Sequence, residues 1–118
     1  MKKLTIDAGV TLILKVDAGI NYEDALNDME SQFNSTTAGV VVESVLTVDC
    51  IENDFDNADR KSIDRVLNIT LKAHDDINLD DDAILNEVLD NMQYSYKSTT
   101  AGVVVEKCKM WDYRNQVE

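Results

Sequence analysis

The same nine residues occur twice in this chain, STTAGVVVE at 35–43 and again at 98–106. The offset between the two copies is 63 residues (98 minus 35), and it continues upstream. Three further pairs match at that offset: Leu26 with Leu89, Met29 with Met92, and Phe33 with Tyr96. Nine identical residues in a row do not arise by chance. The sequence therefore indicates an internal duplication, which is the first feature to settle before any fold is predicted.

Further upstream the two copies match at a shorter offset of 57 residues. There, the pairs Leu14-Lys15 and Ile20-Asn21 recur as Leu71-Lys72 and Ile77-Asn78. The second copy therefore carries six extra residues (63 minus 57) at the start of its helical segment. We expect these residues to make the second helix longer, by under two turns at 3.6 residues per turn.

Each copy is predicted to form a strand, a helix and a second strand. Residues 10–16 and 66–73 are rich in β-branched and apolar side chains, as strands packed against helices are. Asn21 is a good helix N-cap, with acids following in the first turn. Apolar residues then recur at helical spacing, and the helix should break near 35–39, before long strands at 40–51 and 103–113. The helical stripes are Tyr22, Ala25, Leu26, Met29 and Phe33, and Leu85, Val88, Leu89, Met92 and Tyr96.

This order predicts an α+β fold of the ferredoxin-like type, β-α-β-β-α-β, built by duplication of a β-α-β unit. Two helices should pack on one face of a four-stranded antiparallel sheet. The 118 residues include no proline and only four glycines, and they contain no linker-like stretch. We therefore expect a single domain over 1–118, made of repeats at about 9–52 and 64–114.

The two identical loops should lie at opposite ends of the sheet, because a pseudo-twofold axis relates the two halves of this fold. They cannot then form one site in a monomer. In one interpretation the motif ends a helix and starts a strand, with Gly39 and Gly102 freeing the backbone. In the other, the loop hydroxyls contact a symmetric partner or two copies of a ligand. The loop residues concerned are Ser35, Thr36, Thr37, Ser98, Thr99 and Thr100.

The formal net charge is −12, from 23 acids and 11 bases. This charge argues against direct nucleic-acid binding, which depends on Lys and Arg at phosphates, and against binding to an anionic membrane. No apolar run approaches the roughly 20 residues that span a bilayer, and an acid follows the first few residues before any secretory-type apolar stretch develops. We therefore expect a cytoplasmic protein with no membrane partner.

The acids are expected to cover the outer face of the two helices, since the apolar stripes face the sheet. Such a face suits a basic partner surface. The acids assigned to this face are Glu23, Asp24, Asp28, Glu30, Asp80, Asp81, Asp82, Glu87 and Asp90.

No arrangement typical of catalysis, a cofactor or a metal site stands out. His74 adjoins two acids but has no identifiable nucleophile beside it, and its counterpart in the first copy is Asp17. The acidic run at 75–82 lacks the spacing and glycine of a calcium loop. Cys50 and Cys108 lack the close spacing of a metal or redox pair and are expected to be reduced and half-buried. We predict that the protein is not an enzyme.

The final strand, CKMWDYR at 108–114, is an edge in the expected strand order. Trp, Tyr and Arg are enriched at interface hot spots, and an edge strand invites pairing with another chain. Alternatively, alternate residues of this strand are ordinary core. The candidate interface residues are Lys109, Trp111, Tyr113 and Arg114.

The favoured hypothesis is a non-catalytic interaction protein whose acidic helical face engages a protein with a basic, nucleic-acid-binding surface. One form of it is an inhibitor that imitates nucleic-acid charge. In size and charge the chain resembles phage-encoded inhibitors of restriction or CRISPR machinery, although it carries no family motif. The alternative hypothesis is a regulatory domain that binds small ligands and works as a homodimer through its edge strands.

Overall fold

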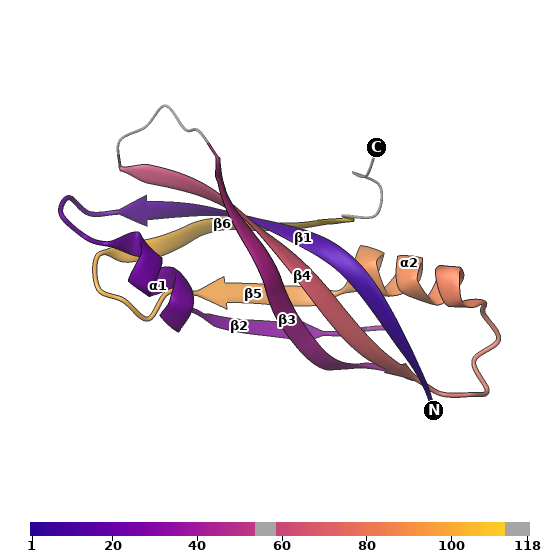
Figure 1. Ribbon diagram of the computed structural model, residues 1–118. Coiled ribbons are helices and arrows are strands. Elements are labelled where there is room, and N and C mark those ends of the chain that lie inside the picture. The colour runs from indigo at the N-terminus through magenta and orange to yellow at the C-terminus, as the bar shows by residue number, and fades with distance from the viewer. Residues whose placement is uncertain (54–58, 113–118) are drawn as a thin grey trace.

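The computed structural model describes residues 1–53 and 59–112 (Figure 1). In this part of the chain, two helices and six strands alternate so that each half has the order strand, helix, strand, strand. The elements are β1 (Lys2–Val16), α1 (Tyr22–Asp28), β2 (Glu30–Asn34), β3 (Val40–Asn53), β4 (Arg60–Ala73), α2 (Asp81–Asn91), β5 (Gln93–Lys97) and β6 (Val103–Asp112).

Four long strands form one antiparallel sheet in the order β3-β4-β1-β6, and β2 pairs with β5 in a separate two-stranded sheet. β1 and β4 begin well before residues 10 and 66, where the sequence predicted them to start. The α+β class and the four-stranded antiparallel sheet are thus confirmed. The two-stranded ribbon was not predicted.

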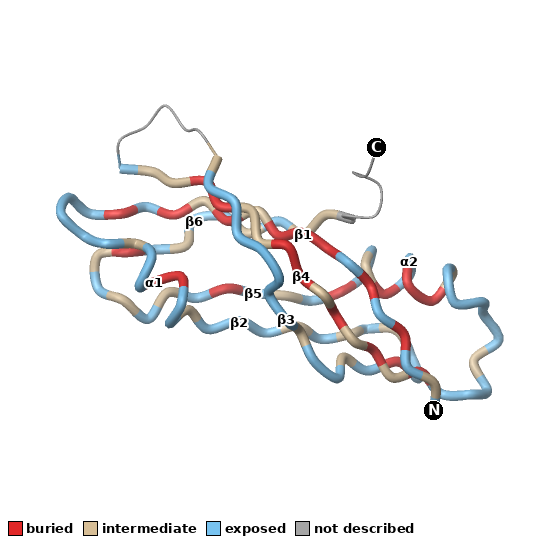
Figure 2. Tube along the Cα trace, viewed as in Figure 1, coloured by how far each residue is buried: buried red, intermediate tan, exposed pale blue. Residues whose placement is uncertain are grey.

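The core lies on one face of the four-stranded sheet. Every even-numbered residue of β1 from Leu4 to Val16 is buried, as the two-residue period of a strand requires when one face packs. The register pairs Leu12 with Ile63, so the buried side chains of β4 share that face. Buried residues of α1 and α2 belong to the same cluster, so both helices cover this face, as predicted (Figure 2). The opposite face carries polar residues such as Thr5.

The helices end earlier than the apolar stripes indicated. α1 stops at Asp28 and α2 at Asn91, and the next residue of each, Met29 and Met92, has an extended backbone. The prediction that the first helix runs through Phe33 is therefore wrong: Phe33 lies in β2. The same holds for the second copy, in which Tyr96 lies in β5. The identical nine-residue segment begins after these short strands, not after a helix.

The six extra residues of the second copy are shared between a loop and a helix. α2 has 11 residues and α1 has seven, a difference of four. The remaining two lengthen the turn before the helix, which spans 74–80 in the second copy and 17–21 in the first. The predicted helix extension is thus confirmed in direction but is shorter than six residues. Neither described helix is long and apolar enough to cross a membrane.

The two helices lie at opposite ends of the β2–β5 ribbon, which runs between them (Figure 1). Phe33 and Tyr96 meet across the ribbon with ring centroids 5.7 Å apart and planes at 87°, an edge-to-face contact. Tyr94 of β5 accepts a hydrogen bond at its hydroxyl from the Met110 backbone N–H (2.7 Å), which ties the ribbon to β6. Helices and ribbon therefore form one layer over the sheet.

A β-bulge occurs at the same place in both copies. The register slips by one residue at Glu43 in β3 and at Glu106 in β6, the last residue of each identical segment. Glu43 lies 3.6 Å from Lys3 and 3.4 Å from Lys72, and Glu106 forms an ion pair with Arg60. Arg60 stands 57 residues after Lys3, so these ion pairs are equivalent. The pseudo-symmetry therefore extends from the backbone to side chains that the identical segment contacts.

Candidate functional site

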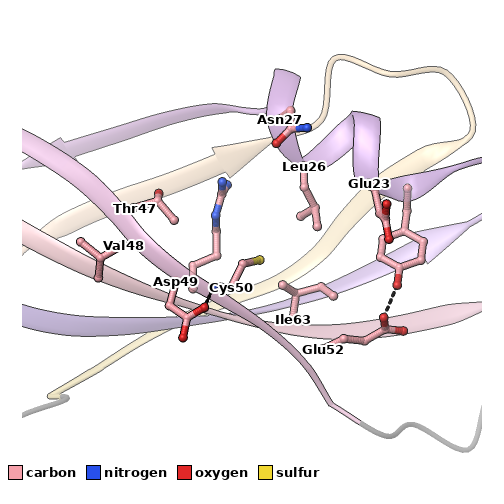
Figure 3. Close-up of a pocket in the computed structure, with 11 residues that line it drawn as sticks. Glu23, Leu26, Asn27, Thr47, Val48, Asp49, Cys50, Glu52 and Ile63 are labelled. Carbon is pink, nitrogen blue, oxygen red and sulfur yellow. Dashed lines mark hydrogen bonds between the residues drawn. The ribbon is translucent and has the colours of Figure 1, made fainter.

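A groove of about 590 Å³ opens between α1 and the edge strand β3, with β4 beneath it (Figure 3). Leu26 and Ile63 give it an apolar floor, since both belong to the core. Acids and hydrogen-bonding groups surround this floor. The residues that line the groove are Tyr22, Glu23, Leu26, Asn27, Thr47, Val48, Asp49, Cys50, Glu52, Ile63 and Arg65.

A hydrogen bond from a tyrosine to a carboxylate joins the two walls of the groove. The Tyr22 hydroxyl, on α1, donates to the carboxylate of Glu52, on β3 (Figure 3). This hydrogen bond, with burial and the nearby negative charges, raises the pKa of Tyr22 to about 12. The Lys61 ammonium lies 5.7 Å from the Tyr22 ring centroid, within cation–π range. The phenol is therefore neutral at physiological pH. It links α1 to β3 through its hydrogen bond and does not act as a base.

Arg65 brings a positive charge to the core-facing side of the sheet. It pairs in register with Val10 on one side and with Cys50 on the other. Its guanidinium carbon lies 5.8 Å from the Tyr96 ring centroid, and its Nε is buried with no hydrogen-bond partner. A buried donor without an acceptor is costly, by about 1–3 kcal/mol. A ligand oxygen in the groove is one way to satisfy it.

Neither cysteine is activated. Burial raises the pKa of Cys50, opposed in part by the charge of Arg65, and burial raises the pKa of Cys108 to about 11. Both thiols are free, Cys108 is half-buried as predicted, and Cys50 is exposed, which the sequence did not predict. Cys50 lies in the second half of the edge strand β3, where most residues are exposed. The thiolate is the reactive form, so these cysteines are poor nucleophiles at neutral pH.

A second, smaller groove of about 250 Å³ occupies the equivalent place in the second copy. Each of its lining residues stands 63 positions after a residue that lines the larger groove. Larger side chains, Met110 and Trp111, occupy the positions of Thr47 and Val48, and Ala8 occupies that of Arg65 at the offset of 57. Only the first copy keeps the open, charged version. The second groove is lined by Asn86, Leu89, Asp90, Met110 and Trp111.

The two identical loops lie at opposite ends of the sheet, since Gly39 bonds to the end of β4 and Gly102 to the end of β1. The Gly39 carbonyl accepts from the His74 backbone N–H (2.9 Å), and the Gly102 carbonyl accepts from that of Asp17 (2.8 Å). Both glycines have positive φ, +79° and +86°. Each therefore needs the left-handed region that glycine adopts without strain.

The loop threonines bind the other copy's helix. Thr36 donates to the Asn91 carbonyl oxygen (2.8 Å), and Thr99 donates to that of Asp28 (2.9 Å). These acceptors are the last residues of α2 and α1, whose carbonyls have no partner within the helix. Ser35 and Ser98 each accept from the backbone N–H two residues on (3.2 Å). The loops therefore have a structural task that accounts for much of their identity.

The third loop residue of each copy makes no equivalent side-chain bond. The Thr37 hydroxyl is buried without a hydrogen-bond partner, and the backbone carbonyls of Thr37 and Thr100 accept from Val40 and Val103 as the chain turns into β3 and β6. Thr100 also accepts a hydrogen bond from the Ser98 hydroxyl (3.3 Å) at its carbonyl. These contacts set the start of the following strand.

The predicted acidic face is divided by the fold. All nine acids are exposed, but seven of them lie in two helices at opposite ends of the β2–β5 ribbon; Asp80 is the N-cap of α2, and Glu30 lies in β2. Asp80 caps α2 by accepting from the Ala83 N–H (2.8 Å), and Asn21 caps α1 as predicted. Asp81 forms an ion pair with Lys2 (2.6 Å). The result is two acidic patches with the same position in each copy.

β6 is an edge strand, as expected. Lys109 is exposed, whereas Trp111 folds back over Gly9 and donates from its indole N–H to the Thr11 hydroxyl (3.0 Å). Thr11 in turn donates to Asp64 (2.6 Å). Trp111 thus packs on its own sheet, on the face away from the helices. Two further candidates for this edge, Tyr113 and Arg114, lie outside the described residues.

His74 lies just after β4 and is exposed, with Nδ1 4.0 Å from Asp76. Among residues 1–53 and 59–112, no three His, Cys, Asp or Glu side chains gather as metal ligands would. The groove was missed by sequence reasoning, because its walls come from segments far apart in the chain. One signal could have found it. The offset of 57 aligns Arg65 with Ala8, so a charged residue stands in the second copy where the first copy has a core alanine.

No family model, curated protein or solved structure matches this chain.

Proposed function

We propose that the protein is a non-catalytic, acidic interaction protein that engages a basic, nucleic-acid-binding surface of another protein. The observation that carries the proposal is the charge of the helices. Neither α1 nor α2 contains a Lys or Arg, and their acids are exposed. Clustered carboxylates of one sign attract a basic surface and speed encounter with it.

An inhibitor that imitates nucleic acid is the form of this function that the charge supports best. A duplex presents phosphate charges spaced regularly along its length. The β2–β5 ribbon lies between the two acidic patches and carries one acid, Glu30, and one base, Lys97. The patches therefore offer two separate contact points to an extended basic channel. On this proposal, duplex DNA competes with the protein for its partner.

The test is a capture experiment from the lysate of the cells that produce the protein, at low and at high salt. We expect nucleic-acid-handling proteins to be retained at low salt and released by salt or by added duplex DNA. In the decisive variant five acids are neutralised together: Asp80→Asn, Asp81→Asn, Asp82→Asn, Glu87→Gln and Asp90→Asn. Asparagine keeps the helix cap at position 80. Unchanged binding by this variant refutes the proposal.

A matched pair of variants separates the position of the charge from its amount. Asp82→Asn with Glu87→Gln removes two charges from α2, whereas Asp7→Asn with Asp64→Asn removes two from the sheet face away from the helices. We expect only the first pair to weaken partner binding. Equal weakening by both pairs would mean that net charge alone drives the association.

Small-ligand binding is a second candidate, favoured by the groove between α1 and β3. The partnerless Nε of Arg65 suits an anionic oxygen, while Glu23 and Glu52 suit a cationic group. We also propose that the four long strands and two helices correspond to a ferredoxin-like fold with β2 and β5 inserted. The order β3-β4-β1-β6 supports this, because two interleaved β-α-β units produce it. A thermal-shift screen with amino acids and nucleotides tests ligand binding.

A further inference from the structure

The two edges of the sheet have opposite character although they derive from the same repeat. At equivalent positions 63 residues apart, β3 carries Leu46 and Val48 where β6 carries Lys109 and Trp111. Leu46 is 63% exposed and Val48 is 56% exposed. Trp111 is folded onto its own sheet and is half-buried. At these two positions the first edge therefore leaves apolar side chains in solvent, and the second does not.

β3 lacks the lysines and prolines that protect many edge strands from pairing, although its register with β4 shifts at Glu43 and at Val48. It is 14 residues long and contains no Lys, Arg or Pro, whereas the shorter β6 carries two exposed lysines. Natural edge strands are usually blunted by lysine, proline or short length, because their free N–H and C=O groups otherwise recruit another strand. Among the described strands, β3 has one hydrogen-bonded neighbour, β4. No described strand therefore pairs with its outer edge.

The charges beside this edge select the occupant. Glu23, Asp49 and Glu52 line the groove along β3. Among the described residues that line it, the one cation is Arg65, whose guanidinium lies over the Tyr96 ring. A second copy of the chain would bring its own Asp49 and Glu52 to the shared edge, and each chain carries a net charge of −12. Like charges facing each other across a strand pair are destabilising. A basic strand is favoured instead.

The alternation of a strand gives the occupant a pattern. Leu46 pairs in register with Asn68, and Ile51 pairs with Asp64; because the register shifts by one residue at Val48, both lie on the sheet face away from the groove. Cys50 and Glu52 lie on the groove side. A strand added to β3 would place one set of its side chains beside Leu46 and Ile51 and the other beside Glu52. The first set should be apolar and the second basic.

We infer that β3 binds an extended segment of the partner, with alternating basic and apolar residues, by β-strand addition. This inference rests on the proposed function, because it names the element of a basic partner that the acidic protein engages. Backbone hydrogen bonds along β3 supply affinity, and the acids beside the groove supply selectivity for Lys or Arg. The acidic patches on the helices then attract the basic partner at long range, and β3 is the edge at which its extended segment binds.

The test uses a synthetic peptide of about eight alternating lysines and valines, a length within the usual range of strands. Its binding to the full chain is measured by fluorescence anisotropy, and β3 amide protection by hydrogen exchange. We expect Leu46→Lys, which installs the residue found at the equivalent position of β6, to weaken binding by about tenfold or more. Val48→Lys, as a second variant, should act in the same direction.

The matched control is Val104→Lys on β6, which adds the same charge at a valine that is 56% exposed. It should leave peptide affinity within about twofold. Thermal unfolding verifies that each variant folds. Equal weakening by Leu46→Lys and Val104→Lys, or protection of β6 instead of β3, overturns the inference. So does a dimer in sedimentation that Leu46→Lys dissociates, because the occupant would then be a second copy.

The two proposals fail in different ways. Neutralising the five acids of the α2 patch should abolish partner capture but leave the β3 amides protected by saturating peptide. Leu46→Lys should remove that protection and leave the helical charge intact. Loss of β3 docking with partner capture retained therefore counts against the inference alone. Retained capture in the five-acid variant counts against the proposed function.

Discussion

The Thr36 hydroxyl donates a 2.8 Å hydrogen bond to the carbonyl oxygen of Asn91, the last residue of α2, 55 residues away in the chain. The equivalent bond from Thr99 reaches the end of α1. Each repeat thus terminates the helix of the other repeat, and identical loops perform identical tasks at both ends of the sheet.

Removing one of these hydroxyls should destabilise the fold without altering its shape. Thr36→Val, which replaces the hydroxyl with a methyl of similar size, should lower the free energy of unfolding by about 1 kcal/mol. Thr99→Val should cost a similar amount, and the double variant should be additive because the sites are far apart. Urea denaturation measures this. Thr36→Ser keeps the donor and should retain more stability than Thr36→Val, and an equally large loss would contradict the hydrogen-bond explanation.

Gly9 makes room for the only tryptophan in the sequence. A Cβ at Gly9 would lie 2.2 Å from Cζ2 of Trp111, so Gly9→Ala must displace the indole. We expect a loss of about 1–3 kcal/mol, typical of overpacking, and red-shifted tryptophan emission as the ring moves into water. Thr11→Val, which removes the indole's acceptor and leaves the space unchanged, should shift the emission less. Unaltered emission in Gly9→Ala would show that the ring does not cover Gly9.

Stability should fall at high pH because buried tyrosines resist ionisation. Burial raises the pKa of Tyr96 to about 12, against an ordinary value of 10.0, although Arg65 opposes this. A group with a raised folded-state pKa contributes its full stability below its unfolded pKa and loses it as pH rises through the folded pKa. The loss therefore falls between pH 10 and 12, at up to about 2.7 kcal/mol for two pH units.

Tyr96→Phe should flatten the pH dependence of the melting temperature in that window. Tyr22→Phe should flatten it less, because the Tyr22 ring is more exposed and solvent screens its charge. The melting temperature of the Tyr96→Phe variant falling as steeply as that of the native protein would assign the transition to other groups. Cys108, whose pKa burial raises to about 11, is the first of these to examine.

The two cysteines should differ in their rates of alkylation. Both should react more slowly with iodoacetamide at neutral pH than a cysteine peptide, because burial raises both pKa values and the thiolate is the nucleophile. Cys50 is exposed and should react before the half-buried Cys108. Mass spectrometry of Cys50→Ser and Cys108→Ser assigns each rate. Arg65→Met should slow Cys50 further, since the guanidinium charge favours the thiolate; a faster reaction would contradict this.

Much of the sheet could be predicted from the sequence because its signals are local. The β-branched runs before each helix, and those that begin with the valines of each identical segment, mark the four long strands. Asn21, followed by acids, marks the start of α1, and the structure confirms that cap. The offsets identify which residues of the two copies are equivalent, such as Lys3 and Arg60, whose ion pairs with Glu43 and Glu106 match in the structure. The strands and the helix cap can be predicted because each depends on residues that are close together in the sequence.

The two short strands were missed because a helical period and a strand period coincide there. Met29 and Phe33 are four residues apart, which fits one face of a helix, yet the chain turns extended at Met29. A signal existed in β5, where Tyr94 and Tyr96 alternate with polar residues. Where each helix ends, a threonine of the other repeat binds its last carbonyl, a contact between distant segments that local patterns do not encode.

The groove could not be predicted for the same reason. Tyr22 and Glu52 come together only when α1 packs beside β3, and Arg65 reaches the groove only through the register of β3 and β4. The loops were interpreted as a helix stop and a strand entry. In the structure they do lead into β3 and β6, but each follows a short strand and binds the end of the other repeat's helix.

Reciprocal contacts of this kind have the geometry of an isologous dimer, in which one patch binds its own counterpart. Here both partners belong to one polypeptide, and the 53-to-59 connection keeps them at high effective concentration. In that arrangement the sequence of each copy can change at positions outside these reciprocal contacts. One groove could acquire Arg65 while Met110 narrowed the other, and one edge could gain lysines while the other kept Leu46 and Val48 exposed. A symmetric pair of separate chains would have had to change both sites at once.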